Sequence, residues 1–298
     1  MDWHTLLTPA NIVAAIIALT PYLAAAFFRE QLTRRVQGLR AWLRFCLPAI
    51  LCLPYVLVSS AAGNFRWQWL VLYAALPPAM AILLWQAGHA GRRGERRSNW
   101  REFVVLAVLG LAVDLRWFEG AWPAHLAVFN KVLLLDAGIY GFVLVRNLEG
   151  TGFDLRLRWK DVAIGMRELV FYTPMALALG LALGFLHAHA VWPRPSAMVF
   201  AWVFTFFFIA VPEELFFRGW LQNLLEERVG RLPALLLTSV LFGLAHFNKR
   251  AVYFNWRYVL LAALAGFFYG RAWRQQRRVG ASAVTHASVD AIWSLWLK

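Results

Sequence analysis

Two adjacent carboxylates and an arginine lie inside a strongly apolar stretch of this sequence. Glu213 and Glu214 follow the run SAMVFAWVFTFFFIAVP, and Arg218 comes four residues after Glu214. An ionisable side chain at the centre of a membrane-spanning helix costs about 3 kcal/mol, so such residues are usually paired or functional. Glutamate four residues before arginine is the favourable order for a helical ion pair, which predicts that Glu214 and Arg218 form a structural pair. The side chain of Glu213 then points about 100° away from that of Glu214 around the helix axis. Glu213 is therefore the carboxylate that remains available for catalysis.

Two imidazoles occur in later apolar stretches, each with a partner four residues away. Phe242 precedes His246 in LFGLAHFN, and His286 precedes Asp290 in VTHASVDAIW, so in a helix each pair lies on one face. A single buried histidine or a single ion pair is more often structural than catalytic. Three apolar segments of the C-terminal half that each carry such a pair, with one spare carboxylate, favour a functional site.

The depth of these side chains in the membrane can be compared by counting along the helices. Glu213 and His246 lie at similar distances from the turn VGRLP, so in an antiparallel hairpin they sit within about one helical turn of each other. His286 lies only a few residues into the last apolar segment, which makes it shallower by about 10 Å. We therefore expect Glu213 to match His246 in depth better than His286, unless helix tilt closes the gap.

The composition restricts the class of protein. Of the 298 residues, 61% are hydrophobic and only 15% are charged, which is more apolar surface than a soluble domain can bury. The formal net charge of +14 would suit nucleic-acid binding, but the Lys and Arg residues lie between the apolar runs rather than together on one face. This pattern indicates membrane topology, so we expect the lipid bilayer as a partner and no nucleic acid.

The apolar runs predict an all-α fold, a polytopic transmembrane helical bundle of about ten spans, since one span needs about 20 apolar residues. The fourth predicted span is the weakest because it contains Asp114, Arg116 and Glu119. The loops on one side hold most of the Lys and Arg residues, which predicts that both termini lie outside. The predicted spans are residues 8–28, 43–61, 66–87, 103–122, 125–145, 168–188, 196–225, 233–247, 254–271 and 279–297.

One long polar segment separates the chain into two halves. In the stretch RNLEGTGFDLRLRWKDVAIGMR, apolar and basic residues alternate, which is typical of an interfacial linker beside the inner leaflet. We predict an N-terminal helical region at residues 1–146, a cytoplasmic linker at 147–167 and a C-terminal domain at 168–298. The N-terminal region resembles nothing that indicates a function.

The motifs of the C-terminal half resemble those of the CAAX prenyl endopeptidase and bacteriocin-processing proteins, the CPBP or Abi family of intramembrane proteases. The family motif EExxxR matches Glu213, Glu214 and Arg218, and its motif FxxxH matches Phe242 and His246. Its third motif, HxxxN or HxxxD, matches His286 and Asp290. The three motifs occur in order on separate predicted helices, which makes the resemblance specific.

This resemblance implies a role for each matched residue. Glu213 with His246 would activate a water molecule for peptide-bond hydrolysis, and His286 with the third-motif residue would stabilise the oxyanion. Glu214, Arg218 and Phe242 would support them. The chemistry agrees, because a carboxylate in apolar surroundings is a competent base near neutral pH and a nearby imidazole can share the proton.

Asp290 departs from the asparagine of the prenyl-protein endopeptidases. An ionised aspartate cannot donate a hydrogen bond to an oxyanion. Either Asp290 orients His286, whose other nitrogen then donates, or it stays protonated in the apolar site. We predict the orienting role.

The cofactor prediction is that no metal is needed, with a divalent metal such as Zn²⁺ as the alternative. Two histidines and one glutamate form a common catalytic zinc set, which here would be Glu213, His246 and His286. The sequence lacks HExxH, however, and the resemblance implies a glutamate-dependent site without metal.

The sequence therefore predicts an intramembrane endopeptidase that cleaves a membrane-anchored or membrane-inserted protein. Its substrates would be prenylated tails, bacteriocin leaders or C-terminal sorting helices. The high Arg and Trp content favours a bacterial inner membrane, where protein prenylation is not expected. The alternatives are a non-proteolytic membrane scaffold or immunity protein, and a proton-coupled transporter that uses Glu213 and His246 as a relay.

Overall fold

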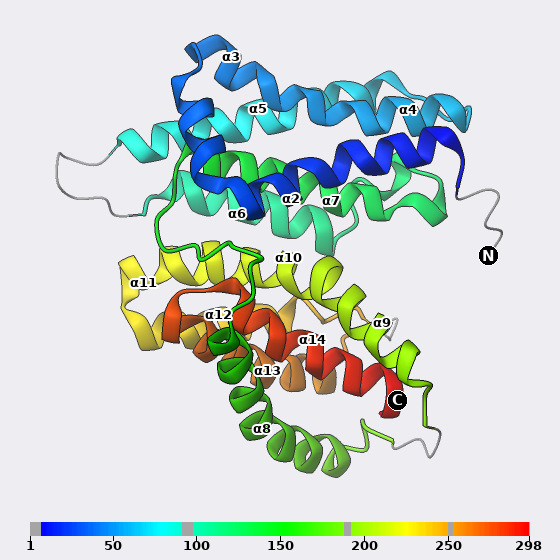
Figure 1. Cartoon of the computed structure of the whole chain (residues 1–298), viewed down its shortest axis with the longest axis vertical. Helices are drawn as coiled ribbons and strands as arrows, with labels where there is room; N and C mark the ends of the chain where they lie inside the picture. The colour runs from blue at the N-terminus through cyan, green and yellow to red at the C-terminus, as the bar shows by residue number, and fades with distance from the viewer. Residues whose placement is uncertain (1–6, 91–97, 188–191, 250–252, 298) are drawn as a thin grey trace. The chain divides into compact units, whose positions relative to one another are not determined.

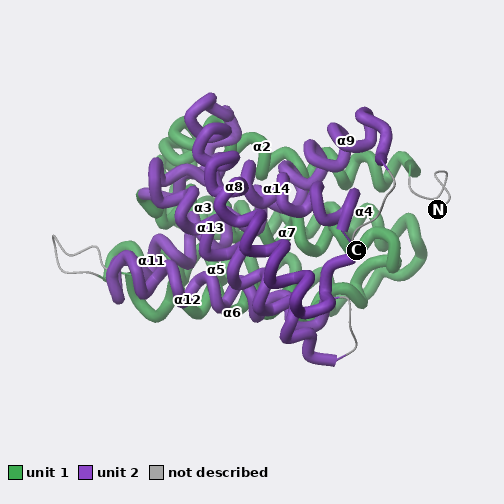
Figure 2. Tube along the Cα trace, turned by 90° about the horizontal axis from the view of Figure 1, so that it is seen from below, with its two compact units in different colours: residues 1–149 green, residues 150–298 purple. Residues whose placement is uncertain are grey.

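The chain folds into helices that form two compact units, Met1–Glu149 and Gly150–Lys298 (Figure 2). The structure is a computed structural model that describes residues 7–90, 98–187, 192–249 and 253–297. The all-α fold class predicted from the apolar runs is confirmed.

The N-terminal unit consists mainly of apolar helices (Figure 1). Side-chain caps fix two helix starts: the Thr8 hydroxyl accepts a hydrogen bond from Asn11 N, and Asn99 forms a capping box with Glu102. The elements are α2 (Pro9–Gly38), α3 (Ala41–Cys46), η1 (Leu47–Cys52), α4 (Leu53–Ala61), α5 (Trp67–His89), α6 (Trp100–Asp114), η2 (Glu119–Ala121), η3 (Ala124–Leu126), α7 (Val128–Gly138) and η4 (Ile139–Val145).

The C-terminal unit contains all the motif residues. Its second apolar segment, Pro195–Val229, is one continuous helical run in which wide π-helical turns flank the two glutamates. The elements are α8 (Trp159–Ala182), α9 (Pro195–Thr205), η5 (Phe206–Ala210), α10 (Val211–Glu214), η6 (Leu215–Gln222), α11 (Asn223–Val229), α12 (Arg231–Leu244), α13 (Trp256–Gln276) and α14 (Val279–Trp296).

Six helices in the described part of the chain are long and apolar enough to cross a membrane. They comprise Pro9–Gly38, Ala41–Ala61, Trp67–His89, Ala124–Val145, Trp159–Ala182 and Pro195–Val229. The chain is therefore a multi-pass membrane protein. The remaining predicted spans correspond to helices that are shorter, such as α12, or that carry more polar residues, such as α13 and α14.

Three predicted spans have clearly different bounds in the structure. The first, predicted to end at residue 28, continues past a non-helical backbone at Phe28 as far as Gly38. The segment predicted as span 103–122 is helical only as far as Asp114, because Arg116 adopts a left-handed backbone (φ 57°) and lies 3.8 Å from Glu119 in an exposed ion pair. The sixth predicted span corresponds to α8. This helix begins at Trp159, inside the segment predicted as a linker, rather than at residue 168. The side chain of Asp161 accepts a hydrogen bond from Arg158 N and thereby caps this earlier start.

Helix α14 is the central element of the C-terminal unit and packs against α8, α13 and α9 (Figure 1). Small residues allow this close packing: a Cβ atom added to Gly165 of α8 would lie 2.6 Å from a methyl carbon of Val284 and 2.8 Å from the Ala281 carbonyl oxygen. The Thr285 hydroxyl donates to the Gly165 carbonyl at 3.0 Å. His286, the next residue, is therefore held in a helix that is buried on most sides.

A buried ion cluster fixes the first residues of α14. The Arg278 guanidinium donates to Asp161 at 2.9 Å, to Asp154 at 3.1 Å and to the Arg156 carbonyl at 2.7 Å. Burial lowers the pKa of Arg278, but the hydrogen bonds with Asp161 and Asp154 raise it overall above its ordinary value. The cluster joins the start of α14 to the start of α8 and so sets the position of His286 two turns further on.

Candidate active site

The two adjacent glutamates have different environments. The side chain of Glu213 is 29% exposed, whereas that of Glu214 is fully buried. They lie at the end of α10, between the π-helical turns of η5 and η6. Such turns change the direction of successive side chains and are frequent at functional sites. Pro212, which lacks a backbone N–H, lies immediately before Glu213.

Glu214 connects three side chains from two helices. Its Oε2 lies 3.2 Å from Nε of Arg218, so the ion pair predicted from their spacing is present. The Ser282 hydroxyl of α14 donates a short hydrogen bond to the same oxygen. Its Oε1 lies 2.8 Å from Nδ1 of His286. Each carboxylate oxygen thus has partners, which is what a fully buried charge requires.

Arg218 is enclosed by aromatic rings as well as by Glu214. Its guanidinium lies 4.8 Å from the centre of the Phe242 ring and 5.7 Å from that of Tyr269, and it donates to the Gly266 carbonyl at 2.9 Å. These contacts stabilise a buried cation through the ring faces. Phe242 also makes an edge contact with His286, with ring centres 5.7 Å apart, so it forms a wall shared by the ion pair and the imidazole.

His286 lies between three carboxylates. Its Nδ1 faces Glu214, while its Nε2 lies 3.5 Å from Asp290 Oδ2 and 3.9 Å from Glu213 Oε2. The ring stacks on Tyr269 at 4.6 Å with an interplanar angle of 14°. A hydrogen bond at a ring nitrogen sets the tautomer and orientation of an imidazole, so Glu214 on Nδ1 and Asp290 on Nε2 both hold the His286 ring in place.

This geometry differs from two expectations of the sequence analysis. Asp290 was expected to orient His286 through one nitrogen and leave the other free, but Asp290 and Glu213 approach the same nitrogen, and Glu214 takes the opposite one. Counting residues along the helices also placed His286 shallower than Glu213, yet the two side chains are 3.9 Å apart. The count assumes straight parallel helices, and it takes no account of tilt or of the π-helical turns.

His246 lies in the turn that follows α12. Its Nδ1 is 2.8 Å from the Phe242 carbonyl, so the local backbone orients the ring. The ring contacts Tyr258 of α13, with centres 5.1 Å apart, and the side chain is largely buried. The other ring nitrogen of His246, Nε2, is then the one that can take part in proton transfer.

Three residues near the site were not identified from the sequence. Ser282 precedes His286 by four residues on α14, so the i, i+4 spacing was a usable signal. Tyr269 has no comparable signal, because it approaches His286 only when α13 packs against α14. Lys249 follows His246 in the same turn, and its Nζ lies 3.9 Å from Oε1 of Glu213.

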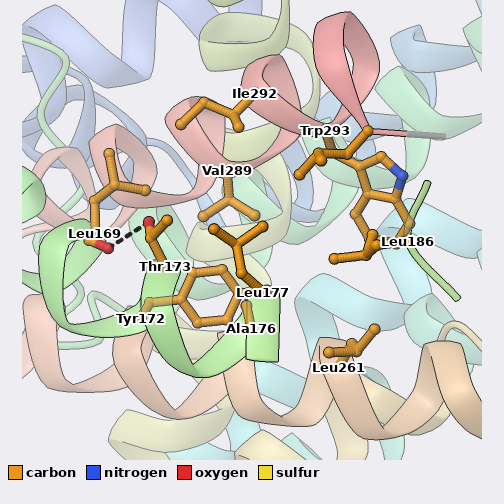
Figure 3. A pocket seen from close by; sticks show the side chains of 11 residues that line it. Leu169, Tyr172, Thr173, Ala176, Leu177, Leu186, Leu261, Val289, Ile292 and Trp293 are labelled. Carbon is orange, nitrogen blue, oxygen red and sulfur yellow. Dashed lines mark hydrogen bonds between the residues drawn. The ribbon is translucent and has the colours of Figure 1, made fainter. Parts of the chain in front are cut away.

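A small polar pocket contains the imidazoles and shares part of its lining with an apolar pocket. The polar pocket is lined by His246, His286 and Asp290 together with aromatic side chains. The apolar pocket has a volume of about 70 Å³ and lies between α8, α13 and α14 (Figure 3). Its one hydroxyl-bearing aliphatic side chain, Thr173, donates to the Leu169 carbonyl at 2.8 Å. The residues that line both pockets are Tyr172, Leu261, Val289 and Trp293.

The predicted alternative zinc ligands do not form a metal-binding group. Among the residues that the structure describes, no three His, Cys, Asp or Glu side chains are arranged to hold a metal ion. We therefore derive no step through a metal ion.

The fold and this site together define a multi-pass helical membrane protein with a buried carboxylate–imidazole centre. Residues 195–292 match the family model of the type II CAAX prenyl endopeptidase Rce1-like proteins, so this part of the chain is an Rce1-like domain. The resemblance that the three motifs indicated is thereby confirmed. Comparison with curated proteins gives no match, and comparison with solved structures gives none.

Proposed function

We propose that the chain is an intramembrane endopeptidase that hydrolyses a peptide bond in a membrane-anchored or membrane-inserted protein. The observation that carries this proposal is the position of Glu213, a partly exposed carboxylate 3.9 Å from an imidazole nitrogen of His286. The match to a family of CAAX prenyl endopeptidases supports the same class of reaction. A general base must be accessible to water, and of the two adjacent glutamates only Glu213 is.

In the proposed reaction, Glu213 takes a proton from a water molecule while the water oxygen forms a bond with the carbonyl carbon of the substrate. The negative charge moves to the carbonyl oxygen. The bond between carbon and nitrogen then breaks, and the proton held by Glu213 passes to the leaving amine. His246, in the adjoining pocket, shares this proton during the transfer.

His286 and Asp290 act on the oxyanion side of the reaction. A doubly protonated imidazole donates from both nitrogens, so His286 can donate to Glu214 through Nδ1 and to the oxyanion through Nε2. Asp290, 3.5 Å from Nε2, favours the cationic ring through its negative charge. This role does not require Asp290 to donate a hydrogen bond.

The apolar pocket supports a substrate with an aliphatic side chain near the cleaved bond. A protein cavity of about 150 Å³ with apolar walls binds benzene. At about 70 Å³, the pocket suits a branched aliphatic group better than an aromatic ring. A transmembrane or lipid-anchored segment of a bacterial membrane protein, such as a sorting helix or a bacteriocin leader, offers such side chains.

Comparative mass spectrometry of membrane proteins tests the proposal. Cells that contain the wild-type chain are compared with cells that contain Glu213→Gln, and new peptide termini are quantified. We expect a set of termini that disappears in Glu213→Gln. The matched control is Glu227→Gln, an exposed glutamate of the same helical run, which should leave the termini unchanged. A proteome whose termini are identical with and without Glu213 would contradict the proposal.

A further inference from the structure

In the proposed reaction His286 is the donor to the oxyanion, and a second nitrogen, that of the Lys249 ammonium group, lies beside the other oxygen of Glu213. We propose that Lys249 is a further catalytic residue, whose ammonium group stabilises the negative charge on the substrate carbonyl oxygen. This inference rests on the proposed function. It concerns a residue outside the three sequence motifs.

Two nitrogens flank the carboxylate of Glu213, one beside each oxygen. Lys249 Nζ lies 3.9 Å from Oε1, and His286 Nε2 lies 3.9 Å from Oε2. Direct N–H···O hydrogen bonds are about 2.7–3.2 Å long, so both nitrogens stop short of hydrogen-bonding distance from the base. The ammonium group of Lys249 therefore remains able to donate to a substrate oxygen that enters beside Glu213.

The backbone of Lys249 is held in place by hydrogen bonds from both sides. Its N–H donates to the His246 carbonyl at 3.2 Å, and its carbonyl accepts from the side-chain amide of Asn255 at 3.2 Å. Asn255 also caps α13 by accepting from Tyr258 N at 3.3 Å. The turn that carries Lys249 is thus fixed to the start of α13, which removes part of the entropic cost of positioning a long side chain.

Among the residues that the structure describes, the ion pair of the Lys249 ammonium group is the one with Glu213. Its side chain is 42% exposed, so it can reach an incoming substrate. Arg218, the other cation described at this site, is fully buried and is engaged by Glu214, the Gly266 carbonyl and aromatic rings. A cation held beside the position of the attacked carbonyl stabilises the developing anion more strongly than water does.

Chemical restoration of the charge tests this role. Lys249→Cys is made in a chain in which Cys46 and Cys52 are replaced by serine, and membranes that contain it are treated with 2-bromoethylamine. The thiolate displaces bromide, which leaves a side chain that ends in an ammonium group and has nearly the length of lysine. The readout is the rate at which Glu213-dependent termini appear in solubilised membrane proteins from cells that lack the enzyme.

We expect Lys249→Cys to lower this rate about 100-fold, the usual effect of losing one oxyanion donor. Aminoethylation should recover most of the loss, while neutral alkylation with iodoacetamide should recover none. Lys249→Arg should stay within about tenfold of the wild type because it keeps the charge. Intact mass verifies each modification, and size-exclusion chromatography with circular dichroism verifies folding.

Three results would overturn the role of Lys249 alone. These are full activity of Lys249→Cys, equal recovery with the neutral reagent, and no recovery after complete aminoethylation of a folded protein. Absence of Glu213-dependent termini in the wild type would instead remove the proposed function, and the role of Lys249 with it. Lys160→Cys, which places the same chemistry at an exposed position on α8, serves as the matched control.

Discussion

Oε1 of Glu214 and Nδ1 of His286 lie 2.8 Å apart, and this contact joins the first motif of the domain to the third. The two residues are 72 positions apart in the chain and belong to different helices of the C-terminal unit. Glu214 pairs with Arg218 on its other oxygen. The carboxylate predicted to be structural therefore also sets the orientation of a candidate catalytic imidazole.

Replacing each glutamate by glutamine should separate stability from turnover. Glu214→Gln leaves Arg218 as a buried cation without a counter-charge, which costs about 3–5 kcal/mol. Glu213→Gln should abolish turnover with little change in the free energy of unfolding, because Glu213 is partly exposed. Thermal unfolding in detergent and the rate of appearance of new termini give the two readouts. Equal destabilisation by both variants would contradict the division of roles.

Ser282→Ala should weaken the link between α14 and the helical run that carries Glu214. The hydroxyl donates to a buried charged carboxylate, and such hydrogen bonds contribute about 1.5–3 kcal/mol. Ser294→Ala is the matched control, since that hydroxyl donates only to a carbonyl of its own helix. The difference between the two melting temperatures measures the link, and no difference would argue against it.

Asp290→Asn should lower turnover about tenfold or more, while the substrate concentration at half-maximal rate stays nearly constant. The asparagine keeps the size of the side chain but removes the negative charge 3.5 Å from His286 Nε2, and this charge favours the cationic ring. The measurement is a comparison of kcat and KM on a peptide that spans a Glu213-dependent cleavage site. Full activity of Asp290→Asn would exclude an essential ionised carboxylate at this position.

Gly165→Ala should destabilise the C-terminal unit by about 1–3 kcal/mol through overpacking. The added methyl group would meet Val284 and the backbone carbonyl of Ala281, and the backbone can move only if α8 and α14 separate. Gly38→Ala is the control, because its added methyl group would meet no atom within 4 Å. Thermal unfolding of the two variants checks the prediction; equal melting temperatures would show that the helices are less closely packed.

Ala176→Phe should fill the apolar pocket and change which side chains are accepted next to the cleaved bond (Figure 3). Branched aliphatic residues should become less frequent at that position, and alanine or glycine more frequent. Met175→Phe, on a half-exposed neighbouring position of α8, should leave the distribution unchanged. The sequences around Glu213-dependent termini give the measurement. If the residue types next to the cleaved bond were unchanged in Ala176→Phe, this pocket would not select the substrate side chain.

Interactions within one helix followed from the sequence. Glu214 and Arg218 are four residues apart, and helix geometry alone brings such a pair together whatever the rest of the chain does. The long apolar runs likewise predicted a multi-pass helical protein, because a bilayer accepts few other structures. Polar residues near the ends of a run made boundaries less certain, as the early end of α6 at Asp114 shows.

Contacts between helices were decided by the tertiary structure. Counting residues could not place His286 beside Glu213, because the distance between them depends on the tilt of α14. It also depends on the π-helical turns around Glu213, which the residue pattern did not predict. Tyr269 approaches His286 from α13, and Lys249 approaches Glu213 from the turn after α12. The sequence by itself determined which side chains are available for chemistry. Only the packing of α14 against its neighbours determined which carboxylate faces which imidazole nitrogen, because that choice depends on distances across helices.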